Sequence, residues 1–250
     1  MVKIKLFGLQ RTCTNYIESL CKLNFGDQIA FCKDAWKHGP FHAHNQKEIL
    51  WGDDTNIIVA VKNPYAWMFS CYNYWKVMDG IGPDLRNISF EEFVTASPVV
   101  LEGSSDVPYL FRASSLMNYY NNMYFHWLSI RDCNLCVIRY EDILNDFEKT
   151  LCDIARQFAL KIQSYLTNID TEIIWGEHNY TDEQRAYIES KAGKFTKKRF
   201  YLDEEYMDAY TDSMLKFIEM DWDYSLMSPE RLDYKVKKGS VFEGIKIPPN

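Results

Sequence analysis

Short hydrophobic runs of strand length alternate along the chain with longer segments whose hydrophobic residues recur at helical spacing. The runs cover residues 4–7, 29–32, 56–61 and 135–139, and the run at 29–32 is the weakest. The run at 56–61 is continuous and β-branched, which is typical of a strand buried on both faces of a parallel sheet. The alternation predicts an α/β fold with a central, mostly parallel sheet flanked by helices.

Helical signals follow most of these runs. They cover residues 15–23, a segment from about residue 64, and residues 114–128, 143–158 and 203–220. Pro64 suits a first helical turn, and the capping-box residues at 89–92 and 181–184 each open a further helix. Residues 97–113 show little periodicity, so we expect a long loop there that acts as a lid or helps to bind a substrate.

One domain accounts for the whole pattern. No internal repeat and no linker separates two hydrophobic cores, and 250 residues suffice for one large α/β domain, which we expect to cover residues 1–227. Residues 228–250 are charged and then rich in glycine and proline, so we expect an extended tail on or near this domain. In such a fold, a ligand site is expected at the carboxyl ends of the strands.

Charge and composition narrow the partners and the compartment. The formal net charge of -7 argues against nucleic acid as a partner, because such binding needs a basic surface. No apolar run is long enough to span a membrane, so we expect a soluble, cytoplasmic protein. The seven cysteines are odd in number and suit reduced thiols. Cys133 and Cys136 have the spacing of a redox or zinc pair, but no second pair accompanies them and Cys136 lies in an apolar run, so we expect buried structural thiols.

A run of small and hydrogen-bonding residues links the first strand to the first helix. It reads Gly8-Leu-Gln-Arg-Thr-Cys-Thr-Asn-Tyr16 and contains one arginine, Arg11. Backbone N–H groups at a helix start favour an anion, and an arginine can add a bidentate hydrogen bond. The run is therefore typical of a phosphate-binding loop, although an ordinary strand-to-helix turn with a surface arginine would have the same residues.

Two further strand ends carry side chains suited to a nucleotide. Lys62 follows the strand at 56–61, and Ser70 lies two turns into the next helix, so both can reach one phosphate. A solvated lysine at a strand end is the alternative interpretation of Lys62. After the strand at 135–139, Arg139-Tyr-Glu-Asp142 offers a charge and, in Tyr140, a flat aromatic face.

Taken together, the three stretches resemble the nucleotide-binding segments of the sulfotransferases that use 3'-phosphoadenosine 5'-phosphosulfate (PAPS). Residues 8–16 resemble the 5'-phosphosulfate loop, the stretch from Lys62 to Ser70 resembles the 3'-phosphate segment, and Arg139-Tyr-Glu-Asp142 resembles the Tyr-Glu-Asp stretch beside the adenine. The likeness covers about residues 1–145. It implies a P-loop-like sulfotransferase architecture, with PAPS as sulfuryl donor and adenosine 3',5'-bisphosphate as product.

The resemblance also implies roles for individual residues. The loop residues that would contact PAPS are Arg11, Thr12, Cys13, Thr14, Asn15 and Tyr16. Within this loop, Arg11 would also stabilise the transferred group. Lys62 and Ser70 would hold the 3'-phosphate, and Tyr140 would lie by the adenine.

Two positions depart from the family pattern. Cys13 replaces the usual glycine, so its side chain must point away from the sulfonate or narrow the pocket. Lys62 replaces the usual arginine. The replacement keeps the positive charge but removes the planar guanidinium, which can make two hydrogen bonds to one phosphate. We expect PAPS binding to survive both changes with reduced affinity.

A histidine-rich stretch supplies the candidate base. Sulfuryl transfer needs a base near the acceptor hydroxyl and cations around the bridging oxygen. The stretch Trp36-Lys-His-Gly-Pro40 resembles the family's Lys-Thr-His segment, which makes His38 the candidate base and Lys37 a stabilising charge. His42 and His44 are alternative candidates, and because no carboxylate-rich cluster accompanies them, we expect no metal site.

Late basic residues complete the expected site. Lys197-Lys-Arg199 resembles the family's stretch that closes over the 3'-phosphate, which would add Lys198 and Arg199 to the PAPS contacts. Lys237-Lys-Gly239 competes for this role, and either stretch is otherwise a solvated charge run.

The sequence therefore predicts a PAPS-dependent sulfotransferase acting on a hydroxyl of a carbohydrate or small metabolite. One alternative is a P-loop nucleotide or small-molecule kinase, but Cys13-Thr-Asn15 stands where a Walker motif needs Gly-Lys-Ser/Thr. The other alternative is a nucleotide-binding module without catalytic activity.

Overall fold

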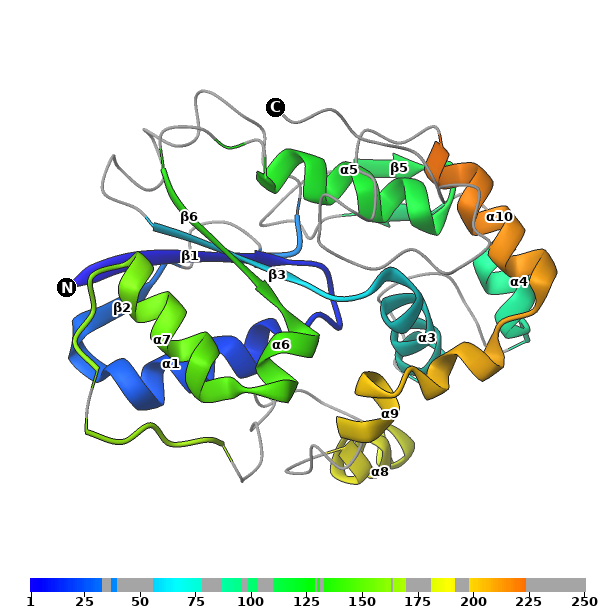
Figure 1. Cartoon of the computed structure of the whole chain (residues 1–250). Helices are drawn as coiled ribbons and strands as arrows, with labels where there is room; N and C mark the ends of the chain where they lie inside the picture. The colour runs from blue at the N-terminus through cyan, green and yellow to red at the C-terminus, as the bar shows by residue number, and fades with distance from the viewer. Residues whose placement is uncertain are drawn as a thin grey trace.

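The structure is a computed structural model of the chain (Figure 1). It describes residues 1–32, 37–39, 56–77, 87–95, 99–102, 110–128, 130, 133–162, 164–169, 181–191 and 198–223. The expected tail at 228–250 lies outside these residues, as do His42, His44 and the stretch at 237–239.

A four-stranded parallel sheet forms the centre of the molecule. Its strands are β1 (Val2–Gly8), β2 (Ile29–Phe31), β3 (Asn56–Val61) and β6 (Asn134–Arg139), in the order β2-β1-β3-β6. Gly8 pairs with Ala60, and Val61 pairs with Arg139, so the carboxyl ends of β1, β3 and β6 are level with one another. Figure 1 shows helices on both sides of this sheet, which confirms the α/β fold with a parallel, helix-flanked sheet.

One face of the sheet is covered by α1 (Thr14–Phe25) and α7 (Phe147–Gln157), which lie below it in Figure 1. The buried side chains of this layer come from alternate strand positions and from one stripe of each helix. They include Ile4, Leu6, Ile58, Ala60 and Ile138 from the strands, and Ile17, Leu20, Leu151 and Ile154 from the helices. The period of two in the strands and the helical spacing in α1 and α7 therefore build the same core.

The opposite face packs against α3 (Pro64–Trp75), α4 (Phe90–Thr95), α5 (Leu116–Leu128) and α10 (Asp212–Asp223). This second core is rich in aromatic rings: Phe7 stacks on Trp127 with 5.7 Å between ring centroids, and Trp67 lies 5.3 Å from Tyr120. The buried phenols donate to strand carbonyls, as in the 2.9 Å bond from the Tyr124 hydroxyl to the Ala60 oxygen. Such bonds let tyrosine fill a core without an unsatisfied hydroxyl.

Several expected elements are divided or replaced in the structure. The single helix expected at 143–158 is two helices, α6 (Tyr140–Asn145) and α7, because the Asp146 side chain caps α7 by accepting from the Lys149 backbone N–H at 2.9 Å. The helix expected at 203–220 becomes the 3-10 helix η2 (Glu205–Ala209) followed by α10. The prediction of an irregular loop over 97–113 is wrong, because β4 (Val99–Glu102) and β5 (Leu110–Ala113) pair as antiparallel strands.

The remaining described elements are η1 (Gly26–Gln28), α8 (Asp182–Lys191) and α9 (Lys198–Leu202). No hydrophobic periodicity predicted α9, which packs against α6 and η2. Within the described part of the chain, no helix is long and apolar enough to cross a membrane. All seven cysteines fall in described segments, and none of them forms a disulfide.

Candidate functional site

Three strand ends meet at one edge of the sheet. Gly8 ends β1, Val61 ends β3 and Arg139 ends β6, and the pairing of these strands brings the segments that follow them side by side. These segments are the loop at 9–13, the turn that begins with Lys62, and the start of α6 at Tyr140. The edge thus has the position at which open α/β sheets bind their ligands.

The loop at 9–13 has an unusual backbone. Arg11 and Cys13 both adopt left-handed conformations, with φ of 69° and 61°. An L-residue in this region costs about 1–2 kcal/mol relative to a right-handed conformation. Gly8 also has no room for a side chain, because a Cβ there would lie 2.7 Å from the Thr12 hydroxyl and 2.9 Å from the Ala60 carbonyl. Backbone strain held by surrounding contacts is typical of ligand-binding loops.

Contacts with the core hold this loop in place. The Thr12 hydroxyl is buried and donates to the Leu9 carbonyl at 2.6 Å, so it closes the loop on itself. Gln10 is fixed from α3: the Trp67 indole N–H donates to its backbone carbonyl at 2.9 Å, and the Trp75 indole N–H donates to its side-chain carbonyl at 3.0 Å. Two indole hydrogen bonds therefore fix the loop at the residue before Arg11.

Helix α1 begins immediately after the loop. Cys13 occupies its N-cap position without a side-chain hydrogen bond to the helix, and the first intrahelical bond runs from the Ile17 N–H to the Cys13 carbonyl at 3.0 Å. The N–H groups of the first turn are the ones that a helix leaves unpaired, and they favour an anion. Of the first-turn side chains, Tyr16 faces the core and donates to the Asn168 side chain at 2.5 Å, and Thr14 is buried.

Lys62 is the most unusual charged residue of this edge. Its side chain is only 2% exposed, and its ammonium nitrogen lies 4.5 Å from the Tyr140 ring centroid and 4.0 Å from the Tyr201 ring centroid. In the part of the chain that the structure describes, no carboxylate forms an ion pair with it. Among the described residues, the rings of Tyr140 and Tyr201 lie over this buried ammonium, and an anionic ligand would neutralise its charge.

Ser70 and Tyr201 lie next to Lys62. Ser70 is buried on α3, and Tyr201 belongs to α9. Burial raises the pKa of the Tyr201 phenol, but the positive charge of Lys62, a hydrogen bond with Ser70 and the charge of Arg11 outweigh it and lower the pKa overall. The surroundings of the phenol oxygen therefore favour negative charge. Arg11 itself lies with its guanidinium carbon 4.4 Å from the Tyr74 ring centroid.

Two residues that follow β6, Tyr140 and Glu141, contact Tyr201 and the start of α3. Tyr140 begins α6, and its ring meets Tyr201 edge-on at 5.2 Å. Burial, followed by the proximity of Tyr201, raises the pKa of Tyr140 far above its usual value, so this phenol stays neutral. Its neighbour Glu141 accepts from the Asn63 backbone N–H at 3.0 Å, and Asn63 caps α3. The carboxylate therefore links α6 to the start of α3.

The Cys13 side chain lies near Lys62. Burial raises the pKa of its thiol well above the usual value, more than the positive charge of Lys62 lowers it. The thiol is therefore neutral and unreactive at physiological pH. It packs against the core cluster beneath α1.

His38 lies beside the amino end of the loop. Its Nδ1 is 2.6 Å from the Gly8 carbonyl oxygen, which can only accept, so Nδ1 carries the proton and Nε2 carries the lone pair. Burial lowers the pKa of His38 to about 4, although the bond to Gly8 opposes this effect. A neutral imidazole with its lone pair on Nε2 has the protonation state of a general base.

The segment at 37–39 is held by three elements. The Gly8 N–H donates to the Lys37 carbonyl at 3.1 Å, and the Trp127 indole N–H donates to the Gly39 carbonyl at 3.2 Å. The Lys37 ammonium donates to the Asn15 side chain and lies 3.8 Å from the Glu18 carboxylate. Burial lowers the pKa of Lys37, and the charge of Glu18 partly restores it. Lys37 is thus directed toward the first turns of α1.

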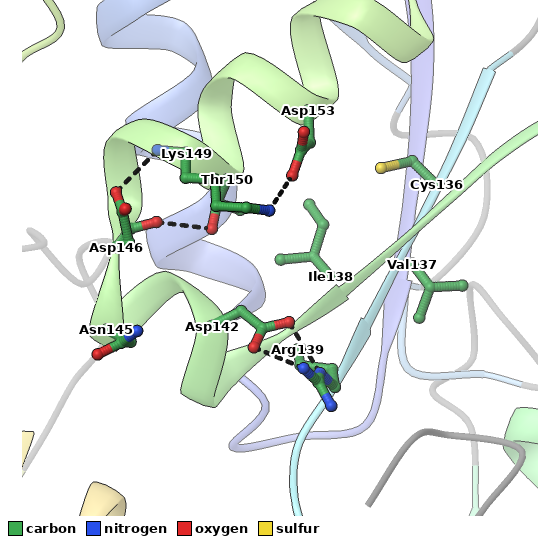
Figure 2. Close-up of a pocket in the computed structure, with 10 residues that line it drawn as sticks. All are labelled: Cys136, Val137, Ile138, Arg139, Asp142, Asn145, Asp146, Lys149, Thr150 and Asp153. Carbon is green, nitrogen blue, oxygen red and sulfur yellow. Dashed lines mark hydrogen bonds and ion pairs between the residues drawn. The ribbon is translucent and has the colours of Figure 1, made fainter.

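A separate cavity of about 340 Å³ lies at the open edge of β6, against α6 and α7 (Figure 2). Its charged side chains pair with one another: Arg139 makes hydrogen bonds of 2.8 and 2.7 Å with Asp142, and Lys149 lies 2.8 Å from Asp153. Figure 2 shows Arg139 turned toward Asp142 in this cavity. The guanidinium of Arg139 is therefore paired with a carboxylate in this cavity.

The chain matched no known family in the comparisons. A scan against protein-family models found no match, and a search of curated proteins also found none. The function is therefore inferred from the residues and geometry of the site.

The structure brings together most of the residues singled out in the sequence. Arg11, Cys13, Lys62, Ser70 and Tyr140 surround one edge, and His38 is bonded to the loop beside them. The Thr12 hydroxyl and the Tyr16 ring are turned into the protein. The backbone of Lys198 and Arg199 belongs to α9, but their side chains lie outside the described part, as does Lys197.

Sequence reasoning missed three contributors to this edge. They are Gln10, which fixes the loop, Glu141, which joins α6 to α3, and Tyr201, which covers Lys62. Tyr201 follows the basic stretch at 197–199 by two residues, and that proximity was the available signal. The other two depend on contacts between residues more than fifty positions apart.

Proposed function

We propose that the protein is a PAPS-dependent sulfotransferase that transfers a sulfuryl group to a hydroxyl of a carbohydrate or small metabolite. The observation that carries this proposal is the buried Lys62, which has no carboxylate partner among the described residues and stands beside Ser70, Arg11 and Tyr140. A phosphate would neutralise this charge. The same four residues belong to the three stretches that resemble the family's nucleotide-binding segments.

The residues at the edge fit the two ends of such a donor. The left-handed loop and the first turn of α1 offer backbone N–H groups for the 5'-phosphosulfate, and Arg11 offers a positive charge beside them. Lys62 and Ser70 suit the 3'-phosphate, and the Tyr140 ring offers a flat face for the adenine. The half-buried, neutral thiol of Cys13 adds no charge that would repel the anion.

The chemistry would require a base at the acceptor. PAPS, when bound, would supply the sulfuryl group. The His38 imidazole would accept the proton of the acceptor hydroxyl at Nε2, while its Nδ1–H keeps donating to the Gly8 carbonyl and fixes the ring. The positive charges of Arg11 and Lys37 would stabilise the negative charge that develops during transfer.

Ligand-dependent melting tests the nucleotide. At a hundredfold excess over its dissociation constant, adenosine 3',5'-bisphosphate should stabilise the protein by about 2.7 kcal/mol, which at this chain length raises the Tm by about 5–10 °C. ATP with Mg²⁺ should leave the Tm unchanged. Stabilisation by ATP with Mg²⁺ alone would favour the kinase instead, and no shift with the bisphosphate would refute the proposal.

Replacement of the base separates an enzyme from a binding module. His38→Asn retains an N–H donor for the Gly8 carbonyl, but an amide is too weak a base to accept a proton at neutral pH. We expect this variant to keep the bisphosphate-dependent Tm shift and to lose sulfuryl transfer, measured with radiolabelled PAPS against a panel of hydroxyl acceptors. If the wild-type protein binds the bisphosphate but modifies no acceptor on the panel, the module becomes the better interpretation.

A further inference from the structure

Tyr201 makes the contacts with Lys62 that a bound anion would otherwise make. The Lys62 ammonium lies 4.0 Å from the Tyr201 ring centroid, and Lys62 and Ser70 both lower the pKa of the Tyr201 phenol, through charge and hydrogen bonding. These two side chains are the ones that the proposed function assigns to the 3'-phosphate. The phenol oxygen and a phosphate oxygen therefore require the same donors.

We propose that Tyr201 is an internal competitor for the anion site at Lys62 and Ser70, and that an incoming phosphate displaces its hydroxyl. The identity of the ligand rests on the proposed function, whereas the displacement applies to any phosphate that reaches Lys62. In the ligand-free protein, the Tyr201 ring lies against the buried ammonium, with which no described carboxylate forms an ion pair.

Contacts made by Phe200 hold α9 in place, so the Tyr201 side chain can move away from Lys62 while the helix stays folded. Phe200, the preceding residue, holds α9 through ring contacts with Phe69 at 5.5 Å and Tyr206 at 6.2 Å. These contacts are independent of Lys62. The Tyr201 ring itself meets Tyr140 edge-on at 5.2 Å, so a change of rotamer exposes both Lys62 and the Tyr140 face together.

The electrostatic surroundings favour the exchange. Burial raises the pKa of Tyr201, but Lys62, the Ser70 hydrogen bond and Arg11 outweigh it and lower the pKa. The position of the phenol oxygen is therefore one in which negative charge is stabilised. A phosphate dianion carries more negative charge than a neutral phenol, so its electrostatic interaction with the same cations is stronger.

Removing only the hydroxyl tests the competition. Tyr201→Phe keeps an aromatic ring over Lys62, and we expect it to bind adenosine 3',5'-bisphosphate and inorganic phosphate about tenfold more tightly than the wild type, as measured by calorimetry. Tyr206→Phe is the matched control, because it removes a buried phenol of the same aromatic cluster. Its affinity for both anions should equal that of the wild type.

The possible outcomes separate the two proposals. Unchanged binding in Tyr201→Phe would overturn the competition, and weaker binding would make the phenol a ligand of the anion instead. If neither the wild type nor the variant binds either anion, the competition is also overturned, because no anion displaces Tyr201. Tighter binding of inorganic phosphate with no binding of the bisphosphate would support the competition and refute the proposed sulfotransferase.

Discussion

Replacing Lys62 by methionine should stabilise the ligand-free protein while removing its affinity for the 3'-phosphate. The ammonium is 2% exposed, and the effective cost of burying such an ion is several kcal/mol. Two desolvated cation–π contacts, with Tyr140 and Tyr201, return about 2 kcal/mol each. Methionine is similar in length and has no charge to bury. We therefore expect Lys62→Met to increase the free energy of unfolding by about 1–3 kcal/mol, equivalent to roughly 2–12 °C in Tm.

Urea unfolding and thermal melting, each with and without ligand, measure both effects. The bisphosphate-dependent Tm shift should disappear in Lys62→Met, and binding of adenosine 5'-phosphosulfate, which lacks the 3'-phosphate, should weaken far less. Lys76→Met is the matched control, since Lys76 is an exposed lysine with a single tyrosine ring 5.3 Å away. Its unfolding free energy should change by no more than about 0.5 kcal/mol.

One result would refute the reasoning on Lys62. If Lys62→Met lowers the unfolding free energy of the ligand-free protein by about 1 kcal/mol or more, the lysine stabilises the fold through its contacts with the two tyrosines. Its burial would then be explained by structure, and no anion would be needed to account for it. Equal losses of affinity for the bisphosphate and for adenosine 5'-phosphosulfate would likewise remove Lys62 from the 3'-phosphate.

Substitutions at three other residues test the loop and the base. Cys13→Gly should raise the unfolding free energy in urea by about 0.5–1 kcal/mol, because glycine adopts a φ of 61° without strain; Cys13→Ala keeps the strain and should show no gain. Gly8→Ala should lower the unfolding free energy by about 1–3 kcal/mol, since its Cβ would lie 2.7 Å from the Thr12 hydroxyl. An unchanged unfolding free energy would show that the loop shifts to accommodate the Cβ. Folding lowers the pKa of His38 from 6.5 to about 4, so the unfolded chain takes up a proton before the folded chain does as the pH falls. The unfolding free energy should then decrease by about 3 kcal/mol between pH 6.5 and pH 4, and His38→Asn should lack this component when unfolding curves are compared across that range.

Local features of the fold could be predicted because their contacts lie within a few residues. The Ser89 side chain and Glu92 form the expected capping box, with a 2.7 Å bond from the Ser89 N–H to the carboxylate, and Thr181 and Gln184 form another. Pro64 lies in the first turn of α3, and the β-branched run at 56–61 is β3. Each of these signals is complete within its own segment.

Features that depend on distant contacts could not be predicted. β4 and β5 are each four residues long, and only their pairing with each other makes them strands. Asp146 interrupts an otherwise continuous hydrophobic stripe, and the stripe concealed the division between α6 and α7. Hydrophobic spacing reports which face of a segment is buried, but it does not report where a side-chain cap ends one helix and begins another.

The site shows the same division. The carboxyl ends of parallel strands lie at one edge of a sheet, so Arg11, Lys62 and Tyr140 could be assigned to that edge from their places after strands. The burial of Lys62 could not be foreseen, because it results from Tyr201 on a helix about 140 residues later in the chain. The tautomer of His38 likewise depends on the Gly8 carbonyl thirty residues earlier.

The attachment of Gln10 to two tryptophans gives the protein an optical signal of its own. Indole emission responds to hydrogen bonding and to the polarity around the ring, and the Trp67 and Trp75 N–H groups donate to the residue that precedes Arg11. A ligand that rearranges residues 9–13 would therefore change tryptophan fluorescence, and Trp75→Phe would separate this change from the emission of the other indoles. Occupancy of the loop becomes measurable in unlabelled protein with any candidate nucleotide, before an acceptor has been identified.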